Sequence, residues 1–128
     1  MIEYGVLKEL DRPVDDVLAE LPGTLKEEGF GVLTTIQLHE KLKEKLGVDF
    51  PRYVILGVCN PPFAHKALKK EKNLGLMLPC NMIVYENNGG SIVAAVKPTV
   101  TMQAVGNDSL QDIAVEIESR LARVVEAL

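Results

Sequence analysis

Two cysteines in proline-bearing junctions are the residues of this chain whose types and spacing most clearly point to chemistry. Cys59 precedes Asn60-Pro61-Pro62, and Cys80 follows Pro79, so each lies where a strand is expected to end or begin. If those strands are antiparallel neighbours, the last residue of one and the first of the next lie at the same end of the sheet. The pattern therefore predicts that the two thiols meet in one candidate site.

The position of Cys59 is compatible with two kinds of chemistry. It lies just ahead of an expected helix N-terminus, where unpaired backbone N–H groups and the helix dipole favour an anion and would lower the pKa of a thiol. A free cysteine is also among the most buried residue types, so Cys59 could simply end a buried strand as a small apolar side chain. Cys80 carries the same alternative, and the sequence leaves both open.

His65 is a candidate third ligand beside the thiols. It follows Pro62 by three residues, and with Cys59 and Cys80 it would supply three soft-metal ligands and leave an open position, as catalytic or transport sites for zinc do. Against this, the twenty residues between the cysteines contain no paired C-x-x-C, and His65 beside Lys66 is equally well explained as a solvated side chain. The metal hypothesis is thus Cys59, His65 and Cys80.

Three further polar residues complete the candidate ligand-binding set. Asn60 and Asn81 flank the cysteines, although asparagine side chains in such places usually cap helices or hold turns. Glu86 follows an apolar strand and would act as an acid or base only if it were buried. Because the chain contains no phosphate loop, no G-x-G-x-x-G and no H-E-x-x-H motif, its catalytic residues remain unidentified.

Length and charge limit the classes of protein that the chain can represent. Its 128 residues are expected to form a single domain, 1–128. Fourteen basic against eighteen acidic side chains give a net charge of −4, which lacks the positive field that nucleic acid requires. No apolar run approaches the roughly 20 residues that span a bilayer, so we expect a cytoplasmic protein without a membrane partner, whose thiols are kept reduced.

Hydrophobic periodicity predicts how the elements position these residues. The first half of the chain is expected to begin with a strand over 4–10 and a helix from Pro13 to Gly29 that is interrupted at Pro22-Gly23. A strand over 30–36, paired with the first strand, and a helix over 38–46 should follow. Next come a strand over 52–59 that is buried on both faces and a helix over 62–72 that buries Phe63, Ala67 and Leu68.

The second half of the chain is expected to hold a hairpin and a long helix. Strands over 82–85 and 91–96 flank Asn87-Asn88-Gly89-Gly90, whose residues tolerate the positive φ angles of a tight turn. An apolar stripe from Leu110 to Leu128 predicts the last helix, starting at Asp108. The fold class is therefore α+β, in the order strand-helix-four-strand-helix, with an antiparallel sheet and helices packed on one face.

Three ordered motifs resemble a known family. They are Gly29-Phe30-Gly31-Val32-Leu33, then Leu56-Gly57-Val58-Cys59-Asn60-Pro61, and then Leu76-Met77-Leu78-Pro79-Cys80-Asn81. In this order and spacing the chain is similar to the bacterial and archaeal domain-of-unknown-function family three hundred and two. The resemblance implies a strand-helix-four-strand-helix fold grouped with the TATA-binding-protein-like folds, and a homodimer, but no activity. Since fold does not carry function, nothing about DNA binding follows from that grouping.

Three functional hypotheses remain. The first is a non-enzymatic module that binds a small ligand or a soft metal ion such as zinc at a cysteine-lined site. The second is a thiol-redox enzyme that uses Cys59 or Cys80 and needs an exposed thiol of depressed pKa. The third is a structural or interaction protein whose cysteines are inert parts of the core.

Overall fold

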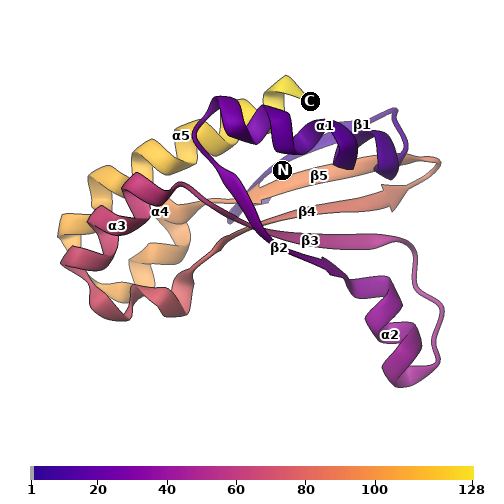
Figure 1. The fold of residues 1–128 in the computed structure, drawn as a ribbon, viewed down its shortest axis with the longest axis horizontal. Helices are drawn as coiled ribbons and strands as arrows, with labels where there is room; N and C mark the ends of the chain where they lie inside the picture. Colours follow the sequence, from indigo (N-terminus) through magenta and orange to yellow (C-terminus); the bar gives the residue numbers. More distant parts are fainter. Residues whose placement is uncertain (1) are drawn as a thin grey trace.

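The computed structural model describes residues 2–128 and arranges them around a five-stranded antiparallel sheet (Figure 1). The strands lie in the order β1-β5-β4-β3-β2. Their bounds are β1 Gly5–Leu10, β2 Gly31–Gln37, β3 Tyr53–Cys59, β4 Cys80–Asn87 and β5 Gly90–Val96. The α-helices are α1 Val14–Glu27, α2 Leu38–Leu46, α3 Pro61–Lys70, α4 Pro98–Thr101 and α5 Gln111–Ala127, and short 3₁₀ turns cover η1 Lys72–Met77, η2 Met102–Val105 and η3 Asp108–Leu110.

The α+β fold class with one-sided helix packing is confirmed. Figure 1 shows α1 and α5 lying side by side over one face of the sheet. The apolar stripe predicted for the last helix is buried there, with Leu110 and Leu121 at 2% and 0% exposure. These side chains meet Val54, Val84 and other apolar residues of the strands in one core cluster. The periodicity of 3.6 in the helices and 2 in the strands accounts for this layer.

The pairing predicted for the second strand is wrong. Instead of lying beside β1, β2 pairs with β3, and β1 pairs with β5. The tight β4–β5 hairpin occupies the middle of the sheet, because Asn88 and Gly89 adopt φ angles of 49° and 83° that suit a two-residue turn. The hairpin thus separates β1 from the β2–β3 pair, so that β1 and β2, the strands on either side of α1 in the sequence, are the two edge strands of the sheet.

The interruption predicted inside the first helix is also wrong. The α1 helix runs from Val14 to Glu27 through Pro22 and Gly23. Both residues lie on the exposed side, while Val17, Leu21 and Leu25 on the other side are fully buried. Burial of that apolar stripe therefore outweighs the local cost of a proline and a glycine in a helix interior.

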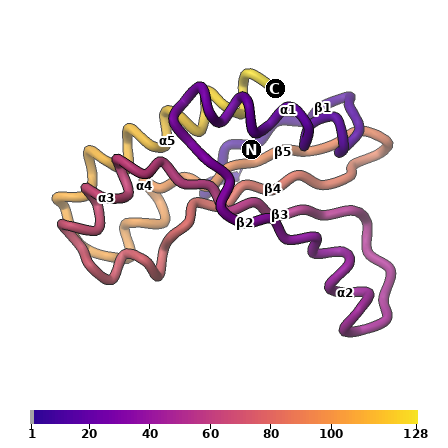
Figure 2. Tube along the Cα trace, in the orientation of Figure 1, coloured from indigo at the N-terminus to yellow at the C-terminus, as the bar shows by residue number. Residues whose placement is uncertain are grey.

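The strand that was expected to be covered on both faces is covered on one. Val54, Leu56 and Val58 of β3 face the helices and are buried, whereas Tyr53 and Ile55 point to the other face and are only partly buried. That second face of the sheet carries no described helix. Figure 2 shows α2 and the segment that leads from it to β3 extending away from α1 and α5.

Length and apolar character together decide whether a helix can cross a membrane. Within residues 2–128, no helix combines enough of both to do so.

Candidate functional site

The two cysteines lie at the same end of the sheet, as predicted. Cys80, the first residue of β4, is opposite Val58 in the β3–β4 register, and Cys59 is the next residue along β3. Both are free thiols in the described chain. Antiparallel pairing of β3 with β4 is what returns the chain to this point after α3 and η1.

Both thiols line a small apolar cavity, which we call the cysteine cavity. Its volume is about 30 Å³, enough for no more than one or two water molecules. Residues from β3, α3, β4, η2 and α5, and from the segments that connect them or lead into β2, enclose it: Phe30, Val58, Cys59, Asn60, Phe63, Ala64, Ala67, Leu78, Cys80, Met102, Ile113 and Ile117. The cavity as it stands is too small for an organic ligand.

The thiols are not activated by the helix that follows Cys59. Burial raises the pKa of the Cys59 thiol above its usual value of 9.0. Burial also raises the pKa of Cys80 to about 11, with a smaller contribution from Cys59. Of the two alternatives that the sequence left open, desolvation of the charged form favours the buried, inert thiol.

A second, larger depression shares a wall with the cysteine cavity, and we call it the methionine hollow. Its volume is about 290 Å³. It is lined by Leu76, Met77, Leu78, Pro79, Cys80, Asn81, Val96, Pro98, Thr101 and Met102. Leu78, Cys80 and Met102 belong to both linings, so these residues form part of the wall between the two spaces. The rim residue Leu76 is 89% exposed.

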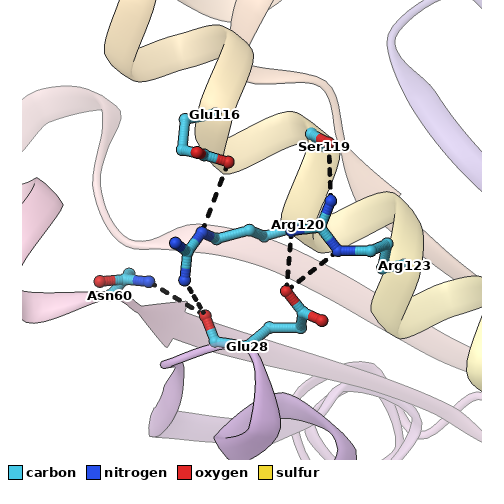
Figure 3. Close-up of polar contacts among 6 residues, drawn as sticks. All are labelled: Glu28, Asn60, Glu116, Ser119, Arg120 and Arg123. Atoms are coloured by element: carbon cyan, nitrogen blue, oxygen red, sulfur yellow. Dashed lines mark hydrogen bonds and ion pairs between the residues drawn. The ribbon is translucent and has the colours of Figure 1, made fainter.

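Asn60 has a structural role in this conformation. Its side chain is 5% exposed, and its Nδ2 donates a hydrogen bond of 3.2 Å to the backbone carbonyl of Glu28. The same carbonyl accepts a bond of 3.1 Å from Nη1 of Arg120 (Figure 3). Because Glu28 follows the last residue of α1, these bonds join the α1–β2 junction to the β3–α3 junction and to α5. They hold the cysteine end of the sheet in place.

Arg120 and Arg123 extend this junction along α5. Nε and Nη2 of Arg123 donate to Oε1 of Glu28 at 3.1 and 2.9 Å. This hydrogen-bonded ion pair lowers the pKa of Glu28 below its usual value of 4.5. The guanidinium of Arg120 lies 5.1 Å from the centre of the Phe63 ring, a cation–π distance that ties α5 to α3.

The other predicted site residues are not gathered around the thiols. Asn81 is exposed and faces away from the helices, and it lines the methionine hollow from that side. Glu86 is also exposed, and it lies six residues further along β4, roughly 20 Å from Cys80 at the usual rise of a strand. His65 is exposed on α3. Across residues 2–128 no three His, Cys, Asp or Glu side chains come together as a metal site, so Cys59, His65 and Cys80 do not form one in this conformation.

A further surface was missed by the sequence analysis: the sheet face away from α1 and α5, which we call the open face. Strand register places a largely apolar set along its middle, with Glu9, Thr34, Asn81 and Asn87 as polar residues on the same face. The apolar residues are Leu7, Ile36, Tyr53, Ile55, Ile83, Tyr85, Ile92, Ala94 and Val96. Tyr53 and Tyr85 stack with ring centres 5.2 Å apart. A sheet face in contact with water normally alternates to polar residues, so an apolar open face indicates an interaction surface.

Residues 38–50, which we call the arm, extend from one end of this face. Among the residues that the structure describes, none in α2 is buried. Leu46, Val48 and Phe50 are 68%, 45% and 48% exposed. The arm is attached to β3 through His39, whose Nδ1 lies 3.1 Å from the backbone N of Tyr53.

Together, these features define a class of protein: an α+β domain with an apolar open face and a sulfur-lined end. Over residues 6–128 the chain matches the model of the family described as Domain of unknown function DUF302, and it belongs to that family. The family resemblance carried by the three sequence motifs is thereby confirmed.

A solved structure supports the same assignment. The crystal structure of the uncharacterized conserved protein DUF302 from Bacillus stearothermophilus is 36% identical in sequence to this chain. The match covers 98% of each chain with a TM-score of 0.91. None of the curated proteins compared with the chain matches it.

Proposed function

We propose that this protein is a non-enzymatic binding module that takes a small, mostly apolar ligand in the methionine hollow. The observation that carries the proposal is the hollow itself, which offers about 290 Å³ at the cysteine end of the β3–β4 pair of strands. That volume is at the lower end of the range for small-molecule sites. The side chains of its lining are apolar apart from Asn81, Thr101 and the thiol of Cys80, and polar atoms make up a large part of its exposed wall, which would orient a ligand.

The raised pKa values of both thiols favour this proposal over the thiol-redox enzyme. A redox-active cysteine needs a populated thiolate and access to its partner. Cys80 is 9% exposed, and burial holds both thiols in the protonated form at neutral pH. The thiols therefore suit a wall of a binding site better than a nucleophile.

Indole is a suitable probe for the experiment, because it is small, apolar and carries one hydrogen-bond donor. We expect saturable amide shifts in residues 76–81 and 96–102 of the labelled protein. Thr101→Phe would fill the hollow and abolish these shifts, whereas the neighbouring Val100→Phe, at an exposed position outside the lining, would retain them. Shifts spread evenly over the surface, or unchanged in Thr101→Phe, would contradict the proposal.

A second candidate function, self-association as a symmetric dimer, is favoured by the open face and the arm. Five strands about 4.8 Å apart and six residues long give a footprint of roughly 480 Å². A standard interface buries ~800 Å² per partner, so the face alone is too small and the arm would have to contribute the rest. A two-fold axis through the open face would place the same apolar surface on both sides and cover it. Sedimentation at micromolar concentration tests this, and a species of monomer mass alone would refute it.

A further inference from the structure

Sulfur atoms are concentrated at the cysteine end of the sheet. Met77 and Met102 line the methionine hollow together with Cys80, so one thiol-bearing and two thioether-bearing residues contribute to the wall of a single space. Cys59 lies across the shared wall in the cysteine cavity. By contrast, Met82 is fully buried in the core of the same sheet and lines neither space. Met77 and Met102 thus border a depression that Met82 does not reach.

We propose that Cys80, Met77 and Met102 bind one Cu(I) ion in the methionine hollow. This inference goes beyond the proposed function, because it assigns a metal ion to the same hollow as a second kind of ligand. Thiolate and thioether sulfur are the soft ligands that select Cu(I), whereas thioethers contribute little to zinc sites. Because two of the three ligands are methionines, the set differs from the His, Cys, Asp and Glu clusters that are typical of zinc.

Charge balance favours a monovalent ion. On binding, the Cys80 thiol loses its proton to solvent, a Cu–S bond forms, and no electron is transferred. One thiolate and one Cu⁺ then cancel, and none of the described residues that line the hollow carries a charge of its own. A divalent ion held by one thiolate would leave a net positive charge, and no carboxylate among the described residues of the lining could balance it.

The three ligands come from segments that the fold holds separately. Met77 ends η1, Cys80 begins β4, and Met102 begins η2. The η1 turn is anchored by Leu74, which is 1% exposed, and Met102 itself is 9% exposed. The ligand set is thus assembled by tertiary structure and not by a local sequence motif, and it excludes both Cys59 and His65.

Competition with a chromogenic Cu(I) chelator under anaerobic, reducing conditions tests the proposal on the full chain. We expect one Cu(I) per chain, with the methyl resonances of Met77 and Met102 shifting while that of Met82 does not. Loss of a group that shapes a metal site typically costs about 10–100-fold in affinity, and we expect at least that loss in Cys80→Ser and in Met77→Leu or Met102→Leu. Met82→Leu, Cys59→Ser and His65→Ala serve as matched controls and should bind like the parent chain.

The outcomes separate the two proposals for this site. If indole binds the hollow but Cu(I) does not, or if Met77→Leu and Met102→Leu bind Cu(I) as the parent does, the copper inference is wrong and the apolar ligand site stands. If Cys59→Ser loses Cu(I) while Met77→Leu and Met102→Leu keep it, the ion lies between the cysteines and the inference is again wrong. If neither indole nor Cu(I) binds, both proposals fail.

Discussion

Glu28 connects three parts of the fold through its backbone carbonyl and its carboxylate. Because the carboxylate titrates, its contribution to stability should depend on pH. The Arg123 pair lowers the pKa of Glu28 in the folded state below 4.5. The stabilisation is therefore complete above the unfolded-state pKa and is lost as pH falls through the lower folded-state value. We predict that the difference in unfolding free energy between the parent and Glu28→Gln is largest above about pH 4.5 and shrinks at lower pH.

Urea unfolding at several pH values measures this difference, and the partner residue supplies the control. In an Arg123→Gln background, Glu28→Gln should produce a smaller difference that varies less with pH, because the hydrogen-bonding partner is gone. A pH-independent difference in the parent background would show that Glu28 contributes through packing alone.

The two asparagines beside the cysteines provide a second prediction at the scale of single residues. Asn60→Ala removes a buried side chain that donates to the carbonyl of Glu28, which keeps only its bond from Arg120, and we expect a loss of about 1–2 kcal/mol. Asn81→Ala alters an exposed side chain and should change stability by no more than about 0.5 kcal/mol. Equal effects in chemical denaturation would contradict the structural role given to Asn60.

At the scale of elements, two glycines in open surroundings should respond to the same substitution with opposite signs. In each case an added Cβ would meet no described atom within 4 Å, so sterics do not decide the outcome. Gly23 lies inside α1, where alanine is favoured by about 0.5–1 kcal/mol. Gly47 ends α2 with φ of 68°, where alanine is strained and should cost about 1 kcal/mol. Thermal unfolding of Gly23→Ala and Gly47→Ala tests both signs, and a lower melting temperature for Gly23→Ala would mean that α1 needs its glycine.

The elements also show how far sequence reasoning reached and where it stopped. Local signals predicted the hairpin, the last helix and the location of both cysteines at one end of the sheet. Strand order was missed because pairing between β2 and β3 is set by tertiary competition for edges, which no local pattern encodes. The methionine hollow was missed because Met77 and Met102 are separated in sequence and methionine more often fills cores than binds ligands.

The apolar run in β3 has a different cause from the one predicted. Nearly continuous apolar character in residues 53–56 predicted a strand covered on both faces, yet in one copy of the chain its second face remains open. The same character recurs on β4 and β5, where Ile83 and Ile92 point to the open face. The apolar sequence of β3 would then reflect burial of both faces of the strand, one under the helices of its own chain and the other under a second molecule.

At the scale of the whole molecule, the proposed dimer makes a sharp prediction. Ile83→Lys puts a charge near the middle of the open face, where a partner would have to bury it, and should give a monomer in sedimentation experiments. The control is Val115→Lys, because Val115 is 50% exposed on α5, on the opposite side of the molecule. This variant should retain the dimer. Circular dichroism should show that both variants fold. If Ile83→Lys still forms a dimer, the interface does not lie on the open face.

The arm has a consequence for how the protein responds to dilution. A helix of nine residues is shorter than the ~12–15 residues that an isolated helix needs to be even marginally stable, and none of the described α2 residues is buried within its own chain. If a second copy provides its missing contacts, helix formation in residues 38–46 and association form one linked equilibrium. Amide exchange in the arm should then accelerate as the protein is diluted, while exchange in β4 and β5 stays constant. In that case the concentration of the protein itself would set the conformation of its arm.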